Sequence, residues 1–323
     1  MLKIFTEAGY DKGLGHYVRI NRICTSLEKS EITFQVFIDA DDTVRQIIHK
    51  NYIIFEKWID NERIKSLIDP EDVILVDSYS YNLTFFDTMK RLAKKVIVID
   101  DNYRLPFSDC TIINPNYFGE FLEYPSNCGN QYFTGKDYTL VREEFFPAKK
   151  IAVNENVTQV LITMGGSDVL QITHQIMDQL LAINSELVLN VVTTTAYKNI
   201  LEIKERIRFK DNLFTNLNAS EMATLMRKVD FAVSAAGGTA NELIKTICPS
   251  ILISVADNQE YNFKYLVENG LAEGFSLDSM QNIDNMFSYS TRCRLVKSMQ
   301  AKRSSKNASD IILKLMTTAN SNI

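Results

Sequence analysis

The sequence predicts an α/β protein with two doubly wound domains, each built around a parallel sheet. Short apolar runs rich in Val and Ile alternate with amphipathic stretches, which is typical of βαβ units. The alternation occurs in two series, one before and one after about residue 150. The length of 323 residues also exceeds what one hydrophobic core usually supports.

The apolar runs place the strands. In the first series we expect strands over residues 2–6, 32–38, 52–55, 73–76, 96–99 and 111–113, and a helix over residues 83–92. In the second series we expect strands over residues 160–164, 187–192, 231–234 and 251–255. A helical pattern over about residues 294–316 ends the chain.

The break between the domains is expected within residues 144–150, where Pro147 and two lysines interrupt the pattern. We therefore predict an N-terminal domain over residues 1–148 and a C-terminal domain over residues 149–323, which the last helix closes. Ligands of open parallel sheets bind at the carboxyl ends of the strands, so the cleft between the domains is the expected site.

The composition argues against several classes of protein. Lys and Arg number 35 against 40 Asp and Glu, so the chain lacks the basic surplus of a nucleic-acid binder. No apolar run reaches the roughly 18–20 residues of a membrane span, and a strand begins at Leu2, which leaves no room for a signal peptide. We expect a soluble, cytoplasmic protein without stable membrane insertion. The five cysteines lack metal-ligand spacing, and three lie in apolar patterns typical of buried thiols: Cys24, Cys110 and Cys248.

The first strand is followed by Gly13-Leu14-Gly15-His16. His16, Ile20, Cys24 and Leu27 recur at helical spacing, which places His16 in the first turn of a helix, at the carboxyl end of the first strand. A histidine at a helix N-terminus tends to stay neutral and able to accept a proton. Spacing alone leaves open whether His16 packs on an apolar face or acts as a base. Position 18 is Val, so the turn is not a dinucleotide fingerprint.

Two glycine turns follow strands of the second series. In Gly165-Gly166-Ser167-Asp168 the glycines permit close approach to a ligand, and Ser167 or Asp168 can cap the next helix. Gly237-Gly238-Thr239 can hold phosphate oxygens through backbone N–H groups at a helix start. Thr239-x-x-Glu242 also fits a capping box, in which Glu242 would only bond the backbone, and both interpretations stay open.

Other polar residues follow strands at Asp77-Ser78-Tyr79, Asp100-Asp101 and Asp257-Asn258-Gln259. Asp100 and Asp101 could ligate magnesium, but no other loop must bring carboxylates to them, so we expect a turn or a structural hydrogen bond and no metal. His49 follows a helical pattern and His174 is expected in the middle of a helix. His16 is therefore the histidine suited to catalysis.

Eight short motifs occur in one order along the chain: Gly13-x-Gly15-His16-x-x-Arg19, Val76-Asp77-x-Tyr79, Ile99-Asp100-Asp101, Asn114-Pro115-Asn116, Leu140-Val141-Arg142-Glu143-Glu144-Phe145, Met164-Gly165-Gly166-Ser167-Asp168, Ser234-Ala235-Ala236-Gly237 and Asp257-Asn258-Gln259. Taken together, these motifs resemble those of a known family over about residues 2–270. The chain is similar to the UDP-2,4-diacetamido-2,4,6-trideoxy-β-L-altropyranose hydrolases of pseudaminic acid biosynthesis and to related spore-coat polysaccharide proteins. It resembles more distantly the N-acetylglucosaminyltransferase that makes the peptidoglycan lipid precursor.

The resemblance implies a GT-B architecture, two Rossmann-like doubly wound domains facing a cleft. It also implies hydrolysis without a metal or another cofactor, in which water attacks the anomeric carbon of a UDP-linked amino sugar, UDP leaves and the configuration inverts. His16 matches the histidine that activates water, and Tyr79 matches a tyrosine near the sugar. The other positions expected to bind substrate are Gly13, Gly15, Arg19 and Asp77 on the sugar side, and Gly165, Gly166, Ser167, Gly237, Gly238, Thr239, Asn258, Gln259 and the ribose-ligand position Glu242 on the UDP side.

Two motifs depart from the family pattern. Thr6-Glu7-Ala8 stands where members commonly read Arg-x-Asp, and Asp77-Ser78-Tyr79 where they often read Asp-His-Tyr. Both positions belong to the sugar side, so the UDP half of the inference is the firmer one. The alternatives are a GT-B glycosyltransferase that uses a UDP- or CMP-sugar in surface polysaccharide biosynthesis, and a binding module without turnover. We expect a monomer or weak oligomer.

Overall fold

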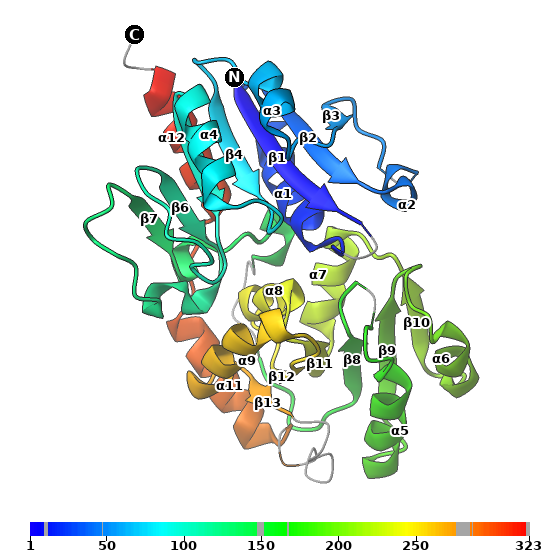
Figure 1. The fold of residues 1–323 in the computed structure, drawn as a ribbon. Helices are drawn as coiled ribbons and strands as arrows, with labels where there is room; N and C mark the ends of the chain where they lie inside the picture. Colours follow the sequence, from blue (N-terminus) through cyan, green and yellow to red (C-terminus); the bar gives the residue numbers. More distant parts are fainter. Residues whose placement is uncertain are drawn as a thin grey trace. The chain divides into compact units, whose positions relative to one another are not determined.

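The computed structural model describes residues 1–9, 12–46, 48–146, 152–166, 168–275, 285 and 287–320. The chain divides into two compact units (Figure 1). The first unit is Met1–Leu140 with Lys306–Ile323, and the second is Val141–Ser305.

In its described residues the first unit forms a seven-stranded parallel sheet, in the order β3-β2-β1-β4-β5-β6-β7. Its strands are β1 (Leu2–Ala8), β2 (Phe34–Ala40), β3 (Ile53–Phe55), β4 (Val73–Asp77), β5 (Lys95–Ile99), β6 (Thr111–Asn114) and β7 (Gln131–Thr134). Its helices are α1 (Gly15–Leu27), α2 (Asp42–Arg45), α3 (Asn61–Leu67), α4 (Leu83–Leu92) and α12 (Ala308–Asn320), with short 3₁₀ turns η1 (Tyr117–Phe121) and η2 (Lys136–Tyr138).

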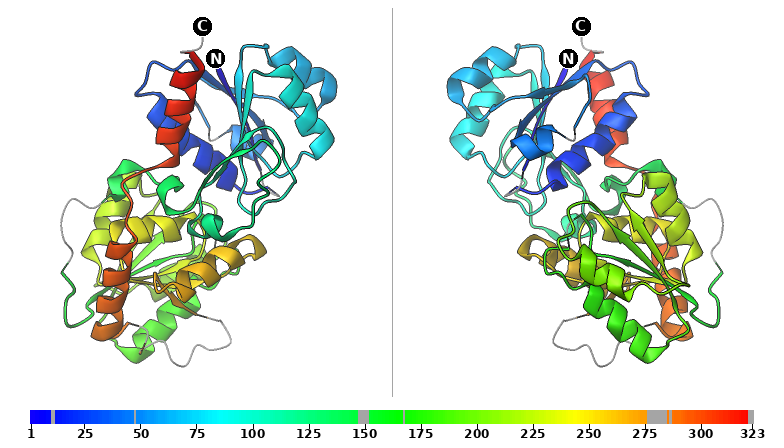
Figure 2. Two further views of the ribbon diagram at one scale, coloured as in Figure 1. Left: turned by 90° about the vertical axis from the view of Figure 1, so that its left-hand side faces the viewer. Right: turned by 90° about the vertical axis from the view of Figure 1, so that its right-hand side faces the viewer.

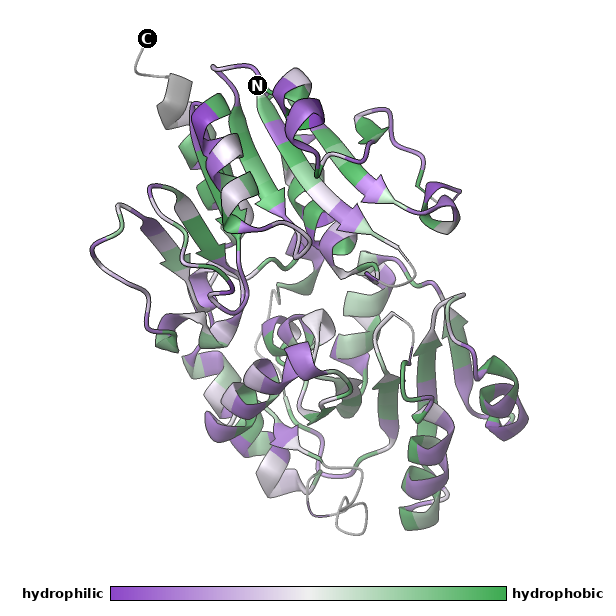
Figure 3. Ribbon diagram, viewed as in Figure 1, coloured by the Kyte–Doolittle hydropathy of each residue, from purple (hydrophilic) through white to green (hydrophobic). Residues whose placement is uncertain are grey.

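Both faces of this sheet are covered. Alternate residues of β1 and β4 point to opposite faces, so Ile4 and Leu75 join the core under α1 and α12, whereas Phe5 and Val76 join the core under α3 and α4. Figure 2 shows α1 and α12 side by side on one face. This double burial explains why the central strands are nearly continuous apolar runs. The hydrophobic colour gives way to hydrophilic at their carboxyl ends (Figure 3).

The second unit has a six-stranded parallel sheet in its described residues, in the order β10-β9-β8-β11-β12-β13. The strands are β8 (Gln159–Thr163), β9 (Val188–Thr193), β10 (Asn212–Thr215), β11 (Phe231–Ala235), β12 (Ser250–Ile253) and β13 (Glu273–Gly274). The helices are α5 (Thr173–Ile183), α6 (Ile200–Arg206), α7 (Ala219–Lys228), α8 (Gly238–Thr246), α9 (Glu260–Glu268) and α11 (Tyr289–Ala301), with 3₁₀ turns η3 (Glu143–Phe145) and η4 (Asp257–Gln259).

The predicted strands are all present, with ends within two residues of expectation, and the predicted helix over residues 83–92 is α4. Three strands were missed: β7, β10 and β13. β13 has two residues, and β7 and β10 carry polar residues at their ends, so none has the apolar run that identified the others. The prediction of buried thiols is confirmed for Cys24, Cys110 and Cys248.

The end of the chain differs from expectation. The single helix expected over residues 294–316 is two helices, α11 and α12, and α12 belongs to the first unit. Ala308, Ile312 and Met316 recur every four residues, and this stripe joins the core that α1 covers. The first unit thus ends at Leu140 and resumes at Lys306. The domain break was expected within residues 144–150, of which residues 147–150 lie outside the described residues; residues 144–146 already belong to the second unit, which begins at Val141. Within the described part of the chain, no helix is long and apolar enough to cross a membrane.

Candidate functional site

The candidate site residues of the first unit lie at the switch point of its sheet, where the strand order reverses between β1 and β4. β1 and β4 are neighbours, but the chain continues from β1 to β2 on one side and from β4 to β5 on the other. In such sheets the carboxyl ends of the two diverging strands bound the ligand crevice. The structure brings His16, Arg19, Asp77 and Tyr79 together at this edge.

His16 lies in the first turn of α1, as predicted, and is buried against a carboxylate. Its Nδ1 is 2.7 Å from Oδ1 of Asp77, the last residue of β4. Burial would raise the pKa of Asp77, but Arg19 and His16 outweigh it and hold that pKa below its usual range. An ionised carboxylate only accepts, so in the neutral imidazole the hydrogen-bond network assigns the proton to Nδ1 and the lone pair to Nε2.

Arg19 joins two carboxylates. Its Nε and Nη2 donate to Asp77 at 2.8 and 2.5 Å, and its Nη1 donates to both oxygens of Asp101 at 2.7 and 2.8 Å. The contact with Asp77, in which two nitrogens meet two oxygens, is the bidentate pairing that is strong and directional, whereas at Asp101 one nitrogen is shared by both oxygens. Against the effect of burial, Arg19, Tyr79 and Asn116 lower the pKa of Asp101 to about 2. The geometry gives Arg19 a positioning role, and its predicted contact with substrate stays a prediction.

Tyr79 faces both His16 and Asp101. Its ring meets the His16 ring edge-on, with centroids 4.5 Å apart, and its hydroxyl donates to Asp101 at 2.5 Å. Desolvation and the charge of Asp101 raise the pKa of the Tyr79 hydroxyl, so it stays protonated. The side chain is 37% exposed, which leaves it accessible to a ligand. Its predicted catalytic role stays a prediction.

Sequence reasoning missed Arg104, which supports the turn after β4. Its guanidinium lies over the rings of Tyr79 and Tyr81, at 5.8 and 4.8 Å, and donates to the Tyr81 carbonyl at 2.9 Å. Arg104 belongs to no motif in the sequence, so only the folded chain reveals this contact.

A second buried carboxylate, Glu7 at the end of β1, lies beside His16. It accepts the Tyr79 N–H at 2.8 Å and the Ser80 hydroxyl, and Lys12 Nζ is 3.2 Å away. Burial opposes ionisation, but these donors outweigh it and hold the pKa of Glu7 below its usual range. Lys12 also binds Asp39 at 2.8 Å. The sequence singled out Glu7 only as a departure from the family pattern.

Asp100 and Asp101 have different partners. Asp100 accepts the Arg104 backbone N–H at 3.1 Å, and burial raises its pKa, whereas Asp101 binds Arg19. Asp100 therefore makes the expected structural hydrogen bonds. Among the described residues, no group of three or more His, Cys, Asp or Glu could hold a metal ion.

In the second unit the predicted glycine turns follow β8 and β11, which bound the switch point of that sheet. Gly165 has φ +76°, and among the described residues, chain neighbours aside, no atom lies within 4 Å of where a Cβ would lie at Gly165 or Gly166. The Tyr197 hydroxyl accepts from Met164 N–H and is 3.2 Å from the Gly165 carbonyl, which braces the turn. Ser167 lies outside the described residues.

The turn after β11 leads directly into α8. Gly237 is the N-cap, and no side chain caps it. Thr239 lies inside the helix, so the capping-box interpretation of Glu242 is wrong. Glu242 is buried, and its Oε1 is 3.8 Å from Nη2 of Arg142.

The turn after β12 lies beside this helix start. The amide nitrogen of Gln259 is 3.4 Å from where a Cβ of Gly237 would lie, and Asn262 donates to the Ala236 carbonyl at 2.8 Å. The structure thus brings Gly237 and Gln259 together, whereas Asn258 is exposed in η4.

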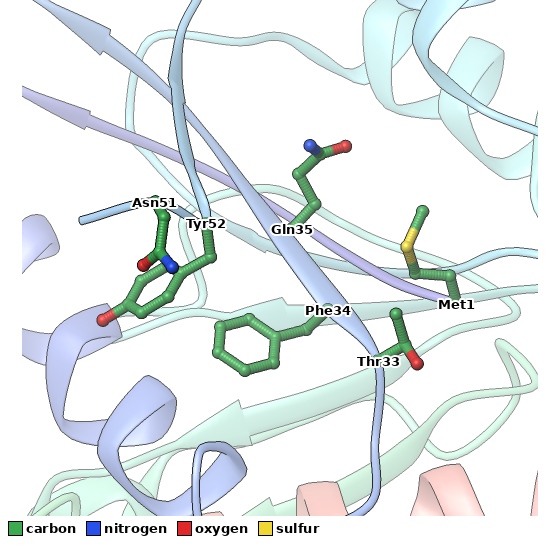
Figure 4. Close-up of a pocket in the computed structure, with 6 residues that line it drawn as sticks. All are labelled: Met1, Thr33, Phe34, Gln35, Asn51 and Tyr52. Carbon is green, nitrogen blue, oxygen red and sulfur yellow. The ribbon is translucent and has the colours of Figure 1, made fainter.

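Of the other two histidines, His49 belongs to the first unit and His174 to the second. His49 is exposed after α2. His174 is in the first turn of α5, not in the middle of a helix as expected, because α5 begins at Thr173. The pocket in Figure 4, of about 430 Å³, lies at the amino ends of β1 and β2, the edge opposite His16; it is lined by Met1, Thr33, Phe34, Gln35, Asn51 and Tyr52.

Comparison with known protein families matches about half of the chain. Residues 152–317 match the family described as Glycosyltransferase family 28 C-terminal domain.

Three of the curated relatives each align with 86% of the chain. An uncharacterized protein of Methanocaldococcus jannaschii is 23% identical, with 62% of its own length covered. The pseudaminic acid cytidylyltransferase and UDP-2,4-diacetamido-2,4,6-trideoxy-beta-L-altropyranose hydrolase of Helicobacter pylori is 24% identical, with 49% covered. The spore coat polysaccharide biosynthesis protein SpsG of Bacillus subtilis is 25% identical, with 84% covered. The chain thus spans less than two thirds of the first two relatives.

Solved structures show the fold. MurG of Acinetobacter baumannii matches with a TM-score of 0.65 at 14% identity, over 98% of this chain and 99% of that chain. The MnaA–UDP structure of S. aureus matches with a TM-score of 0.62 at 12% identity, over 100% of this chain and 98% of that chain. The chain has the GT-B fold, as predicted.

Proposed function

The chain belongs to the Glycosyltransferase family 28 C-terminal domain family, and from this premise we propose that it is a nucleotide-sugar hydrolase with His16 as general base. The observation that carries the proposal is the 2.7 Å contact between His16 Nδ1 and the buried carboxylate of Asp77. This pairing leaves Nε2 as a proton acceptor at the carboxyl end of a parallel sheet, where such folds bind their ligands.

The proposed reaction divides the chemistry between the two units. In the first, His16 takes a proton from water as the water attacks the anomeric carbon, and Asp77 stabilises the imidazolium that forms. In the second, the backbone N–H groups at the start of α8 and the open Gly165-Gly166 turn receive the leaving diphosphate. The resemblance adds inversion of configuration and independence of metal.

The proposed substrate is a UDP-linked amino sugar, specifically UDP-2,4-diacetamido-2,4,6-trideoxy-β-L-altropyranose. The name of the Helicobacter pylori relative supports this choice, although that name joins two activities and this chain covers 49% of that protein. Glu242 is proposed as the ribose ligand. Its place on α8, close behind Gly237 and Gly238, supports this role.

The second candidate is a glycosyltransferase, which the family match and the likeness to MurG favour. His16 would then deprotonate an acceptor hydroxyl. Incubation with UDP-sugars in the absence of any acceptor separates the candidates. A hydrolase releases UDP and free sugar in equal amounts, whereas a transferase or a binding module leaves the substrate intact.

The first prediction concerns His16→Asn. The variant should fold, because Asn is tolerated at a helix start, but it cannot take a proton, so kcat should fall by at least about 100-fold with little change in KM. The matched control is His49→Asn, which changes an exposed histidine and should keep full activity. A folded His16→Asn protein with near-normal kcat would remove His16 from the mechanism. UDP release and a thermal melt measure both properties.

A further inference from the structure

A second hydrogen-bond acceptor lies beside His16, and the inference drawn from it rests on the proposed hydrolysis. We propose that Glu7 makes water, and not an alcohol, the nucleophile. In this arrangement one water molecule donates one hydrogen to Nε2 of His16 and the other to Oε1 of Glu7.

The separation of the two acceptors fits one water molecule. His16 Nε2 and Glu7 Oε1 are 3.9 Å apart, which is too far for a direct hydrogen bond. A polar separation of this size is often bridged by water. Two hydrogen bonds of about 2.8 Å span it with an angle of about 90° at the water oxygen, close to the angle between its O–H bonds.

Glu7 has one acceptor position left for this water. Its Oε2 accepts the Ser80 hydroxyl and faces Lys12 Nζ at 3.2 Å, while Oε1 accepts only the Tyr79 N–H among the described residues. Each carboxylate oxygen accommodates about two donors, so Oε1 retains the free position. Because the donors around Glu7 keep its pKa low, the carboxyl is ionised and cannot donate.

Two acceptors determine the orientation of the water. Both hydrogens point at the protein, and the lone pairs point away, toward a substrate. One lone pair forms the bond to the anomeric carbon while the bond from that carbon to the phosphate oxygen breaks, and its electron pair leaves with the nucleoside diphosphate. One proton passes to His16 Nε2, and the other stays on the new hydroxyl, hydrogen-bonded to Glu7.

An alcohol cannot satisfy both acceptors. Its single O–H goes to His16, so its lone pair or its carbon meets the buried carboxylate of Glu7 without a hydrogen bond. A site whose acceptor binds a donor of the ligand discriminates against analogues that lack this donor, because the buried acceptor is then left without a hydrogen bond. Glu7 therefore favours hydrolysis over transfer to a hydroxyl.

The test uses methanol as a competing nucleophile. The protein is incubated with the UDP-sugar in aqueous methanol, and free sugar and methyl glycoside are quantified. Wild type should form almost only free sugar. Glu7→Met lacks the acceptor and should raise the ratio of methyl glycoside to free sugar at least about tenfold. The matched control is Asp39→Asn, which changes the other carboxylate bound to Lys12 and leaves Glu7 in place, so it should keep the wild-type ratio.

The product ratio does not depend on the fraction of folded protein, so a purely structural role of Glu7 would leave it unchanged in Glu7→Met. That outcome would overturn the inference, as would a wild-type protein that forms methyl glycoside in proportion to the methanol present. If Glu7→Met forms no product, the product ratio of the wild type still tests the inference, because methyl glycoside in proportion to the methanol present overturns it. Absence of UDP release from wild type is a different failure, that of the proposed function.

Discussion

At the scale of single residues, the site depends on charges that would be costly to bury alone. Asp77 is fully buried, the side chain of Asp101 is 16% exposed, and Arg19 holds both in hydrogen bonds of 2.5–2.8 Å. Removing one member of such a cluster leaves its partner unpaired, which is more costly than the net worth of the pair. The cluster therefore keeps Asp77 ionised and in place against His16.

The second prediction follows from the low pKa of Asp101. The pKa in the folded state is about 2, below the ordinary 3.8, so ionised Asp101 stabilises the fold above about pH 4, and this contribution of about 2 kcal/mol is lost as the pH falls toward 2. The stability difference between wild type and Asp101→Asn should be constant from pH 7 to about 5 and shrink between about pH 4 and 2.

Urea denaturation at each pH measures this difference. Asp87→Asn is the matched control, because Asp87 is half exposed and its pair with Lys90 is 3.9 Å long, so its removal should change stability little. A difference between wild type and Asp101→Asn that stays constant down to pH 2 would contradict the assigned pair.

The third prediction concerns metal. The protein donors already bound to Asp101, and the positive end of α8 available to phosphate, make a divalent ion unnecessary in the proposed reaction. UDP release should therefore survive excess EDTA. Loss of activity that Mg²⁺ or Mn²⁺ restores would show that Asp100 and Asp101 bind an ion.

At the scale of elements, two glycines precede or begin α1, and their backbone conformations differ. Gly13 has φ +69°, a left-handed conformation that costs other residues about 1–2 kcal/mol. Gly15 begins α1 without a positive φ, and among the described residues, its chain neighbours and its own helix backbone aside, no atom lies within 4 Å of where its Cβ would be. The fold itself requires glycine only at position 13.

The fourth prediction compares these positions. Gly13→Ala should lower stability by about 1–2 kcal/mol. Gly15→Ala should leave stability unchanged or slightly higher, because Ala is the better helix former, but it should raise KM if substrate approaches this backbone as predicted. Thermal melts and UDP-release kinetics on both variants measure these effects. A Gly15→Ala protein with normal kinetics would argue against substrate contact at this turn.

At the scale of the whole molecule, the chain ends in the unit where it began. α12 adds Ala308, Ile312 and Met316 to the core that α1 and β1 form, so the first unit is complete only with the last helix. Because α1 carries His16, α12 supports the helix that presents the proposed base.

The fifth prediction tests that support. Ile312 is fully buried, so Ile312→Ala should destabilise the protein by about 2–5 kcal/mol. The exposed Lys314 on the same helix is the matched control, and Lys314→Ala should change stability by less than about 0.5 kcal/mol. Equal effects of the two substitutions on urea denaturation would mean that α12 does not pack as described.

The sequence by itself determined the two parallel sheets, because strands buried on both faces must be apolar runs, and it placed His16 at the start of α1, because helical periodicity begins there. Only the tertiary structure determined which side chains His16 and Arg19 contact. Arg19, Asp77 and Asp101 lie far apart in the chain, and their contact depends on the order β1-β4-β5, which no local pattern records.

The dependence on distant contacts also explains two features that the sequence analysis missed: that α12 belongs to the first unit, and that Glu7 lies beside His16. The apolar stripe of α12 predicts that one face of this helix packs against a hydrophobic core. It does not indicate to which of the two units that core belongs. In the sequence, Glu7 is one polar residue in an apolar strand. The pairing of β1 with β4 places its carboxylate near Nε2 of His16, whereas Asp77 contacts Nδ1. Periodicity is a local property of the chain, whereas the choice of partner depends on contacts between residues distant in sequence.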